Sequence, residues 1–151
     1  MKQISLLLLI ILTLFSCKKK EDAVSQAQLD EDIITKYISN NNLDATATGS
    51  GLYYVLNTVG TGLKPLGSST VTVAYKGYLT DGEVFDESTS AGISFSLDGV
   101  IEGWQEGIPY FKEGGDGILL IPSALGYGSQ KQGSIPANSV LIFDISLIDV
   151  Q

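Results

Sequence analysis

Two segments of the chain alternate between apolar and polar residues, a pattern that fits the extended β conformation. The alternation runs over 70–75 and, with longer apolar residues, over 141–147. Because successive side chains of a strand point to opposite faces, this period of two predicts strands with one buried face. Shorter strand-like runs, bounded by glycine-rich turns, cover 52–58, 93–97 and 117–121. Together these segments predict about five short strands.

One interval between these strands has a helical period instead. Trp104, Ile108 and Phe111 lie at positions i, i+4 and i+7, which places them on one face of a helix. Pro109 lies inside this interval and predicts a short or irregular helix, since proline has no N–H to donate. Strands in succession with a single helix predict the α+β class, an antiparallel sheet with that helix on one face.

A second, amphipathic helix is predicted near the N-terminus, between Ser25 and Asn41. Its apolar residues form two adjacent rows, Leu29, Ile33 and Tyr37 in one and Ile34 and Ile38 in the other. Ser25, followed three positions later by Gln28, fits a capping box. Two interpretations of the apolar stripe remain open: it packs on its own domain, or it forms a weak homodimer with a second copy.

The first residues have the profile of a secretory signal. Lys2 precedes an apolar run over 4–15, which is shorter than the roughly 20 residues of a membrane-spanning helix. A retained membrane span is the weaker alternative. The run ends in Leu14-Phe15-Ser16-Cys17, which resembles a bacterial lipobox, where the chain is cut before a cysteine that becomes acylated. Lipidation of Cys17 is therefore predicted, and a free thiol is the alternative.

These features predict four segments. They are a lipoprotein signal peptide over 1–16, a charged tether over 17–24, an N-terminal helical extension over 25–48 and a single domain over 49–151. Several acyl chains on Cys17 would hold the protein stably on a membrane. The predicted location is the bacterial cell envelope, at the outer membrane or a membrane surface that faces the periplasm.

Composition argues against several classes of function. The chain has no histidine and one cysteine, which removes the common nucleophile–base pairs of hydrolases. Nine basic residues against seventeen acidic ones argue against a nucleic-acid partner. No glycine-rich loop followed by lysine is present to hold a nucleotide, and no cofactor is predicted. Asp81, Glu83, Asp86 and Glu87 follow one hairpin and are interpreted as surface acids; metal ligands or a glycosidase pair are the alternatives.

Short motifs rich in glycine, aromatic and acidic residues follow one another through the second half of the chain. They occupy 73–79, 82–88, 95–97, 100–104, 121–128, 135–139 and 141–144. Motifs such as Gly82-Glu83-Val84-Phe85-Asp86 and Val100-Ile101-Glu102-Gly103-Trp104, in this order, resemble the FKBP family of peptidyl-prolyl cis-trans isomerases. The resemblance covers roughly residues 50 to 150. It implies a strongly bent, five-stranded antiparallel sheet wrapped around a short helix, in agreement with the periodicity.

The resemblance also implies a set of site residues. Catalytic positions are matched by Tyr75, Phe85, Asp86, Trp104, Tyr127 and Phe143. Substrate-binding positions are matched by Ile93, Phe95, Val100, Ile101 and Ile135. Trp104 corresponds to the floor of the family's pocket and Asp86 to the acid at its rim. The Tyr127 hydroxyl and the Ile101 backbone N–H are expected to hold substrate carbonyls.

Such a site needs no nucleophile. The barrier to rotation about the amide is resonance, so any environment that favours the twisted bond accelerates exchange. The implied substrates are X-Pro bonds of unfolded or partly folded envelope polypeptides. Two alternatives remain: a non-catalytic module or chaperone of the same fold that binds proline segments, and a carbohydrate-binding lipoprotein that cradles a sugar between aromatic residues.

Overall fold

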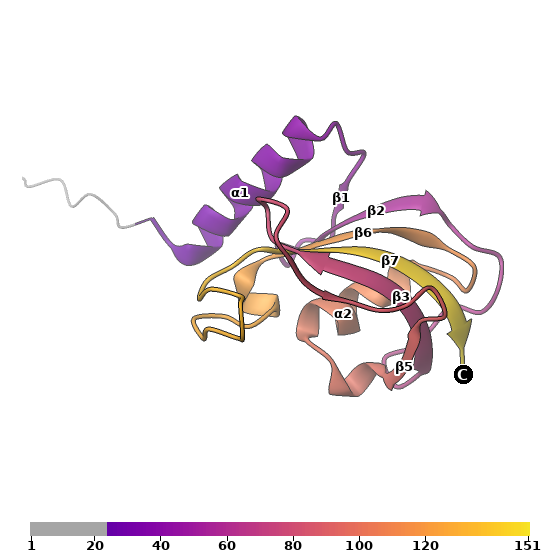
Figure 1. The fold of residues 1–151 in the computed structure, drawn as a ribbon. Coiled ribbons are helices and arrows are strands. Elements are labelled where there is room, and N and C mark those ends of the chain that lie inside the picture. The colour runs from indigo at the N-terminus through magenta and orange to yellow at the C-terminus, as the bar shows by residue number, and fades with distance from the viewer. Residues whose placement is uncertain (1–23) are drawn as a thin grey trace, which may run out of the picture.

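A computed structural model describes residues 24–151 of the chain (Figure 1). The predicted signal peptide, Cys17 and all but the last residue of the predicted tether lie outside these residues. The helices and strands, in chain order, are α1 (Gln26–Asn40), β1 (Thr46–Ala47), β2 (Tyr53–Thr58), β3 (Thr70–Tyr78), β4 (Val84–Glu87), β5 (Ile93–Ser96), α2 (Glu102–Gly107), β6 (Asp116–Ile121) and β7 (Leu141–Val150). Three short 3₁₀ turns lie between these elements: η1 (Leu97–Gly99), η2 (Ile108–Tyr110) and η3 (Ser123–Leu125). Within this range no helix is long and apolar enough to cross a membrane.

All strands pair antiparallel in one sheet of order β1-β2-β6-β7-β3-β4, and β5 also pairs with β3. The outer edge of β3 is divided, with β5 along Thr70–Val73 and β4 along Lys76–Tyr78. The sheet has seven strands where the sequence predicts five. The additional strands are β1, which has two residues, and β4, where only Phe85 is partly buried, so neither has an alternation to recognise.

The concave face of the sheet wraps around α2 (Figure 1). Trp104, Ile108 and Phe111, the predicted helical face, are all buried there. The helix is short as predicted: α2 ends at Gly107 and continues as the 3₁₀ turn that contains Pro109. It lies directly on β6, because a side chain at Gly107 would overlap Leu119. The predicted α+β class, with a bent antiparallel sheet and a short helix, is confirmed.

Helix α1 covers part of the opposite face of the sheet (Figure 1). Ser25 caps it, accepting a hydrogen bond from the Gln28 N–H at 3.3 Å. The predicted capping box is only half formed, because the Gln28 side chain donates to Asp32 at 3.0 Å instead. Ile34 is fully buried against Val55, Leu120 and Val140. One apolar row therefore packs on its own domain. Leu29 and Ile33 in the other row are 44% and 40% exposed, and pairing of two copies through them stays a prediction.

Candidate functional site

A pocket of about 560 Å³ opens on the concave side of the sheet, beside α2. Its walls come from the middle strands, from the segment before α2 and from the loop between β6 and β7. The lining residues are Tyr75, Phe85, Asp86, Phe95, Gly99, Val100, Ile101, Trp104, Tyr127, Gln132, Gly133, Ser134, Ile135 and Phe143. Residues far apart in the sequence thus meet in one cavity of the size that takes a small molecule or a few residues of a peptide.

Aromatic rings build the floor and inner walls of this pocket. The indole of Trp104 meets the rings of Tyr75 and Phe143 edge to face, with centroids 5.1 and 5.2 Å apart. Phe85 meets Phe143 at 5.5 Å in the same manner. Gly77 on β3 makes this possible, since any side chain there would overlap the rings of Phe85 and Phe143. These edge-to-face contacts hold the rings at fixed angles and keep the inner pocket apolar.

The indole N–H of Trp104 is a buried donor without a hydrogen-bond partner within residues 24–151. Such unpaired groups are rare in folded proteins, because burial removes their bonds to water. The side chain is only 5% exposed, so its place at the floor is set by packing.

A carboxylate at the rim is held by a tyrosine from the neighbouring strand. The Tyr75 hydroxyl donates to Asp86 Oδ2 at 2.7 Å. Strand pairing brings the two together, because Asp86 on β4 lies opposite Gly77 on β3. Ser88 fixes the backbone of Tyr75 by two hydrogen bonds. Its hydroxyl accepts from the Tyr75 N–H at 2.9 Å, and its own N–H donates to the Tyr75 carbonyl at 3.0 Å. The carboxylate therefore has a fixed position at the pocket mouth.

Two phenols at the pocket are held neutral. Burial, followed by the hydrogen bond to Asp86, raises the pKa of Tyr75 to about 12. Burial also raises the pKa of Tyr127, and the negative charge of Asp86 adds to this. Both hydroxyls are hydrogen-bond donors throughout the neutral range.

Tyrosine ionisation should make the fold less stable at high pH. Burial is the main cause that raises the pKa of Tyr75, Tyr78 and Tyr127 above 10.0, and the hydrogen bond to Glu31 is the main cause that raises the pKa of Tyr53. Because these phenols ionise more readily in the unfolded chain, their contribution is complete below pH 10 and is lost as the pH rises toward about 12, the pKa of Tyr75. Urea unfolding between these limits should show a falling free energy of unfolding, and Tyr78→Phe should reduce the slope. An equal slope in the variant would contradict this account.

The loop between β6 and β7 supplies the upper wall. Tyr127 follows η3, and Ile135 is brought back to the pocket by paired backbone hydrogen bonds with Gln132 at 3.0 and 2.9 Å. Gln132, Gly133 and Ser134, together with Gly99 before α2, line the pocket but are absent from the sequence prediction. The available signal for the loop residues is the polar, glycine-containing run that leads into Ile135.

Ten of the eleven pocket residues expected from the sequence line the cavity. The structure corrects the place expected for Ile93, which lies outside the lining and is 47% exposed. It pairs with Val73 at the start of β5, two residues before Phe95. Both side chains point to the same face, but one full repeat of the strand carries Ile93 beyond the cavity.

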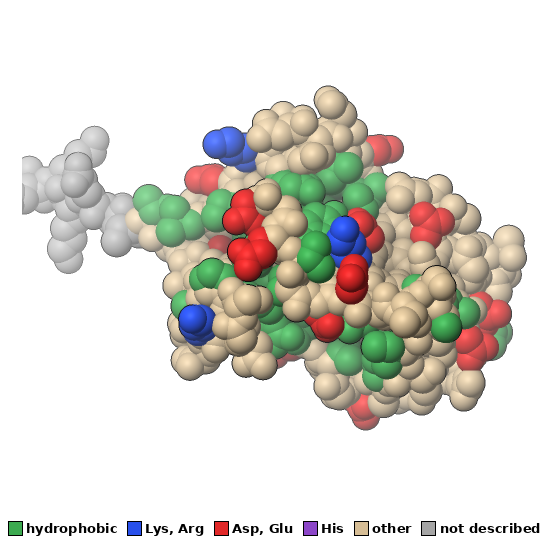
Figure 2. Space-filling view, in the orientation of Figure 1, with side chains coloured by type: hydrophobic (Ala, Val, Ile, Leu, Met, Phe, Trp, Pro, Cys, Tyr) green, Lys and Arg blue, Asp and Glu red, His purple; other side chains and the backbone are tan. Residues whose placement is uncertain are grey.

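The hairpin acids have hydrogen-bonding roles of their own. Asp81 accepts from the Glu83 N–H at 3.0 Å inside the β3–β4 turn, and Asp86 accepts from Tyr75. Within residues 24–151, no group of three or more His, Cys, Asp or Glu side chains is placed to hold a metal ion. Acidic side chains outnumber basic ones on the face shown in Figure 2.

Comparisons with known proteins converge on one family. A family model described as FKBP-type peptidyl-prolyl cis-trans isomerase matches residues 63–148. The FKBP-type peptidyl-prolyl cis-trans isomerase FkpA of Escherichia coli strain K12 is 40% identical over 136 residues, which cover 89% of this chain and 50% of the relative. FkpA of Aeromonas hydrophila is 38% identical over 140 residues, covering 91% and 52%. The chain thus spans about half the length of the curated relatives it matches.

Comparison with solved structures points to the same family. The crystal structure of FkpA from Escherichia coli has a TM-score of 0.71 at 38% identity, covering 83% of this chain and 62% of that one. A peptidyl-prolyl cis-trans isomerase from Pseudomonas syringae pv. tomato has the same TM-score at 30% identity, covering 85% and 98%.

Proposed function

We infer, because the chain belongs to the FKBP-type peptidyl-prolyl cis-trans isomerase family, that it catalyses rotation about X-Pro bonds in other polypeptides. The observation that carries this inference is the pocket itself. Trp104 forms its floor, aromatic rings form its walls and the Tyr75–Asp86 pair holds a carboxylate at its rim. All of these residues lie within the segment that matches the family.

The physical task of such a site is to favour a twisted amide over both planar isomers. The planar bond is held by resonance, with a barrier of about 18–20 kcal/mol. Resonance also separates charge between nitrogen and oxygen, and twisting reduces that dipole. An apolar pocket therefore destabilises the planar forms relative to water more than it destabilises the twisted one. The aromatic rings around Trp104 supply this environment without a nucleophile or cofactor.

Polar groups at the pocket would hold the peptide while one bond rotates. The Tyr127 hydroxyl and the Ile101 backbone N–H are proposed to bind substrate carbonyls on either side of the proline. Ile101 is fixed in place because its own carbonyl accepts from the Trp104 and Gln105 N–H groups at the start of α2. Asp86, held by Tyr75, is proposed to face the rotating carbonyl and to keep its neighbours oriented.

The test of this proposal is the exchange rate of short X-Pro peptides with the purified full chain. Uncatalysed exchange takes tens of seconds, so catalysis by substoichiometric protein is directly visible. Acceleration for peptides with different residues before proline is the expected result. Binding without acceleration would favour the non-catalytic module or chaperone, and saturable sugar binding would favour the carbohydrate-binding alternative.

We further propose that this isomerase is a lipoprotein of the bacterial cell envelope, acting on unfolded or partly folded envelope proteins. The support is in the sequence, where Lys2 and an apolar run lead to the lipobox-like Leu14-Phe15-Ser16-Cys17. A weak homodimer through α1 is part of the same proposal and rests on exposed Leu29 and Ile33.

Lipidation has a direct test in cells. The full chain should incorporate a labelled fatty acid and sediment with membranes, and Cys17→Ser should lose both properties, since Cys17 is the chain's one cysteine. Ser16→Ala keeps the cysteine and is the matched control, expected to behave like the unchanged chain. A chain that takes up no lipid, or a Cys17→Ser variant that still does, would overturn the lipoprotein proposal.

A further inference from the structure

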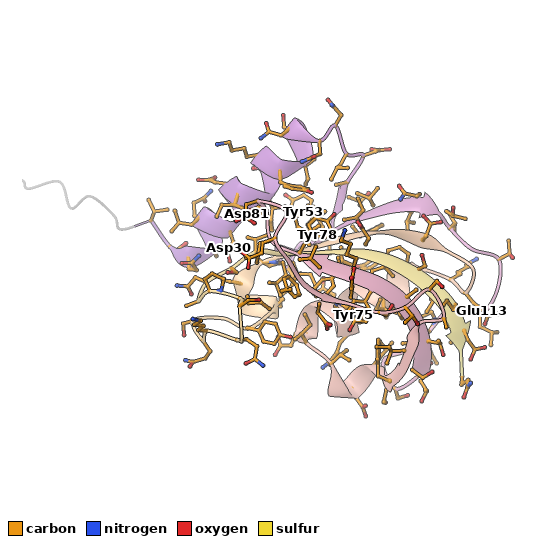
Figure 3. All side chains as sticks on the ribbon, viewed as in Figure 1. Asp30, Tyr53, Tyr75, Tyr78, Asp81 and Glu113 are labelled. Atoms are coloured by element: carbon orange, nitrogen blue, oxygen red, sulfur yellow. The ribbon has the colours of Figure 1, made fainter. Side chains whose placement is uncertain are left out.

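An acidic side chain lies on the buried face of α1, four residues before Ile34 and therefore on the same row. The residue is Asp30 (Figure 3). It is only 1% exposed. Buried carboxylates are rare and are stable only when other groups satisfy their oxygens. Here Oδ1 accepts from Gln26 Nε2 at 2.7 Å, and Oδ2 accepts from the N–H and the hydroxyl of Ser123 at 2.8 and 2.6 Å. Two of these three donors belong to one residue distant in the chain.

Ser123 is a junction between α1 and the loop over the pocket. It is the first residue of η3 and is 2% exposed. While Asp30 takes its N–H and hydroxyl, its carbonyl accepts from the N–H groups of Gly126 at 3.0 Å and Gly128 at 2.8 Å. Tyr127 lies between these two glycines. A continuous chain of hydrogen bonds thus runs from α1 to the backbone on both sides of a pocket-lining tyrosine.

The same junction extends to the rest of the loop. The Gly128 carbonyl accepts from the Asn138 N–H at 2.8 Å, which closes the segment that carries Gln132, Gly133, Ser134 and Ile135. Long loops such as this one between β6 and β7 are usually among the less stable parts of a fold. Bonds to a carboxylate are roughly twice as strong as bonds between neutral groups. Asp30 therefore anchors this loop from outside the sheet.

We propose that Asp30 is a positioning residue of the pocket, which acts through Ser123 to hold Tyr127 and its loop in place. The kinetic part of this proposal rests on the proposed isomerase function. Under this proposal α1 contributes to the geometry of the site, although no residue of α1 lines the pocket.

Three variants of the full chain separate positioning from general stability. Asp30→Ala removes the acceptor of both Ser123 bonds. Asp30→Asn keeps one acceptor oxygen for Ser123 without the negative charge and should restore part of the anchoring. Ile34→Ala weakens α1 on the sheet through Val55, Leu120 and Val140 without touching Ser123. It is the matched control, and all three should be compared under conditions where urea unfolding shows them fully folded.

Two readouts decide the proposal. Hydrogen exchange at the Gly126 and Gly128 amides reports the loop directly and needs no activity. Asp30→Ala should accelerate this exchange at least tenfold and lower kcat/KM for an X-Pro peptide by roughly tenfold, within the range of known coupling energies. Ile34→Ala should stay within about twofold of the unchanged chain in both readouts. Asp30→Asn, which keeps the acceptor and loses the charge, should fall between Asp30→Ala and the unchanged chain.

Each outcome has a distinct meaning. Equal effects of Asp30→Ala and Ile34→Ala on the two amides would overturn the proposal, because Asp30 would then only attach a helix. Unchanged kcat/KM in Asp30→Ala, with a catalytically active unchanged chain, would also overturn it. If the unchanged chain does not catalyse exchange, the isomerase function fails, and amide exchange together with peptide affinity, measured by Trp104 fluorescence, still decides whether Asp30 positions the loop.

Discussion

Trp104→Leu is expected to lower kcat/KM for X-Pro exchange on the order of 100-fold, a loss typical of a mispositioned reacting group. The indole ring closes the pocket floor and fixes the rings of Tyr75 and Phe143 at its edges. Leucine fills less space and removes the indole contact from both rings. Water can then enter the inner pocket, and the apolar environment that favours the twisted amide is lost. The measurement is peptide exchange with the purified variant.

A folded variant is needed for this comparison, because replacing a buried Trp also destabilises the fold, although Leu should cost less than the roughly 3–5 kcal/mol of a truncation to Ala. Tyr54→Leu is the matched control. Tyr54 packs against the same concave core and stacks on Tyr110 with centroids 4.3 Å apart, but it does not line the pocket. It should lose stability and keep its kcat/KM. Equal losses of activity in the two variants would show that catalysis does not depend on the Trp104 floor.

Phe111→Ala should cause the largest loss of stability, about 3–5 kcal/mol as for other buried Phe truncations. Phe111 follows η2, is fully buried, and belongs to the cluster between α2 and the sheet. Its ring lies against β6, since any side chain at Gly117 would overlap it. A domain of this size has about 5–15 kcal/mol of stability in total, so the variant should remain folded with a much lower urea midpoint.

The neighbouring Tyr110→Ala gives the matched control for this measurement. Tyr110 is 37% exposed and its main contact is the stacked ring of Tyr54. The stacked pair contributes about 0.5–1.5 kcal/mol beyond its buried area. Because Tyr110 is more exposed than Phe111, its truncation should cost less than that of Phe111. If the two variants unfold at the same urea concentration, Phe111 is not the central core residue that its burial indicates.

The fold could be predicted where a regular period reflects burial on one face. The alternation in β3 and β7 and the helical spacing of Trp104, Ile108 and Phe111 each correspond to side chains that the structure buries. The two strands that escaped prediction have no such signal. β1 is fully exposed, and β4 is ordered by pairing with β3.

The pocket walls could be predicted because the order of the sequence motifs resembles the family, whose pocket residues match positions in this chain. Ten of those residues line the cavity. The polar, glycine-containing run at 132–134 indicates a loop before Ile135, but not that the loop lies at the pocket. Ile93 was expected at the pocket from the family resemblance alone, and its position at the start of β5 carries it beyond the cavity. Helical spacing places Asp30 on the row of Ile34, which the sheet covers, but nothing in the sequence identifies its partner Ser123, 93 residues away.

Exchange spectroscopy by NMR on an X-Pro peptide at equilibrium, with substoichiometric full chain, tests the central claim most directly. Signals of the cis and trans peptide should exchange within the mixing time with the unchanged chain, and should stop exchanging with Trp104→Leu. Such exchange is too fast to be spontaneous, since the free peptide needs tens of seconds. A folded chain that shifts the peptide signals without exchanging them would contradict the account and leave a module that binds proline segments without turning them over.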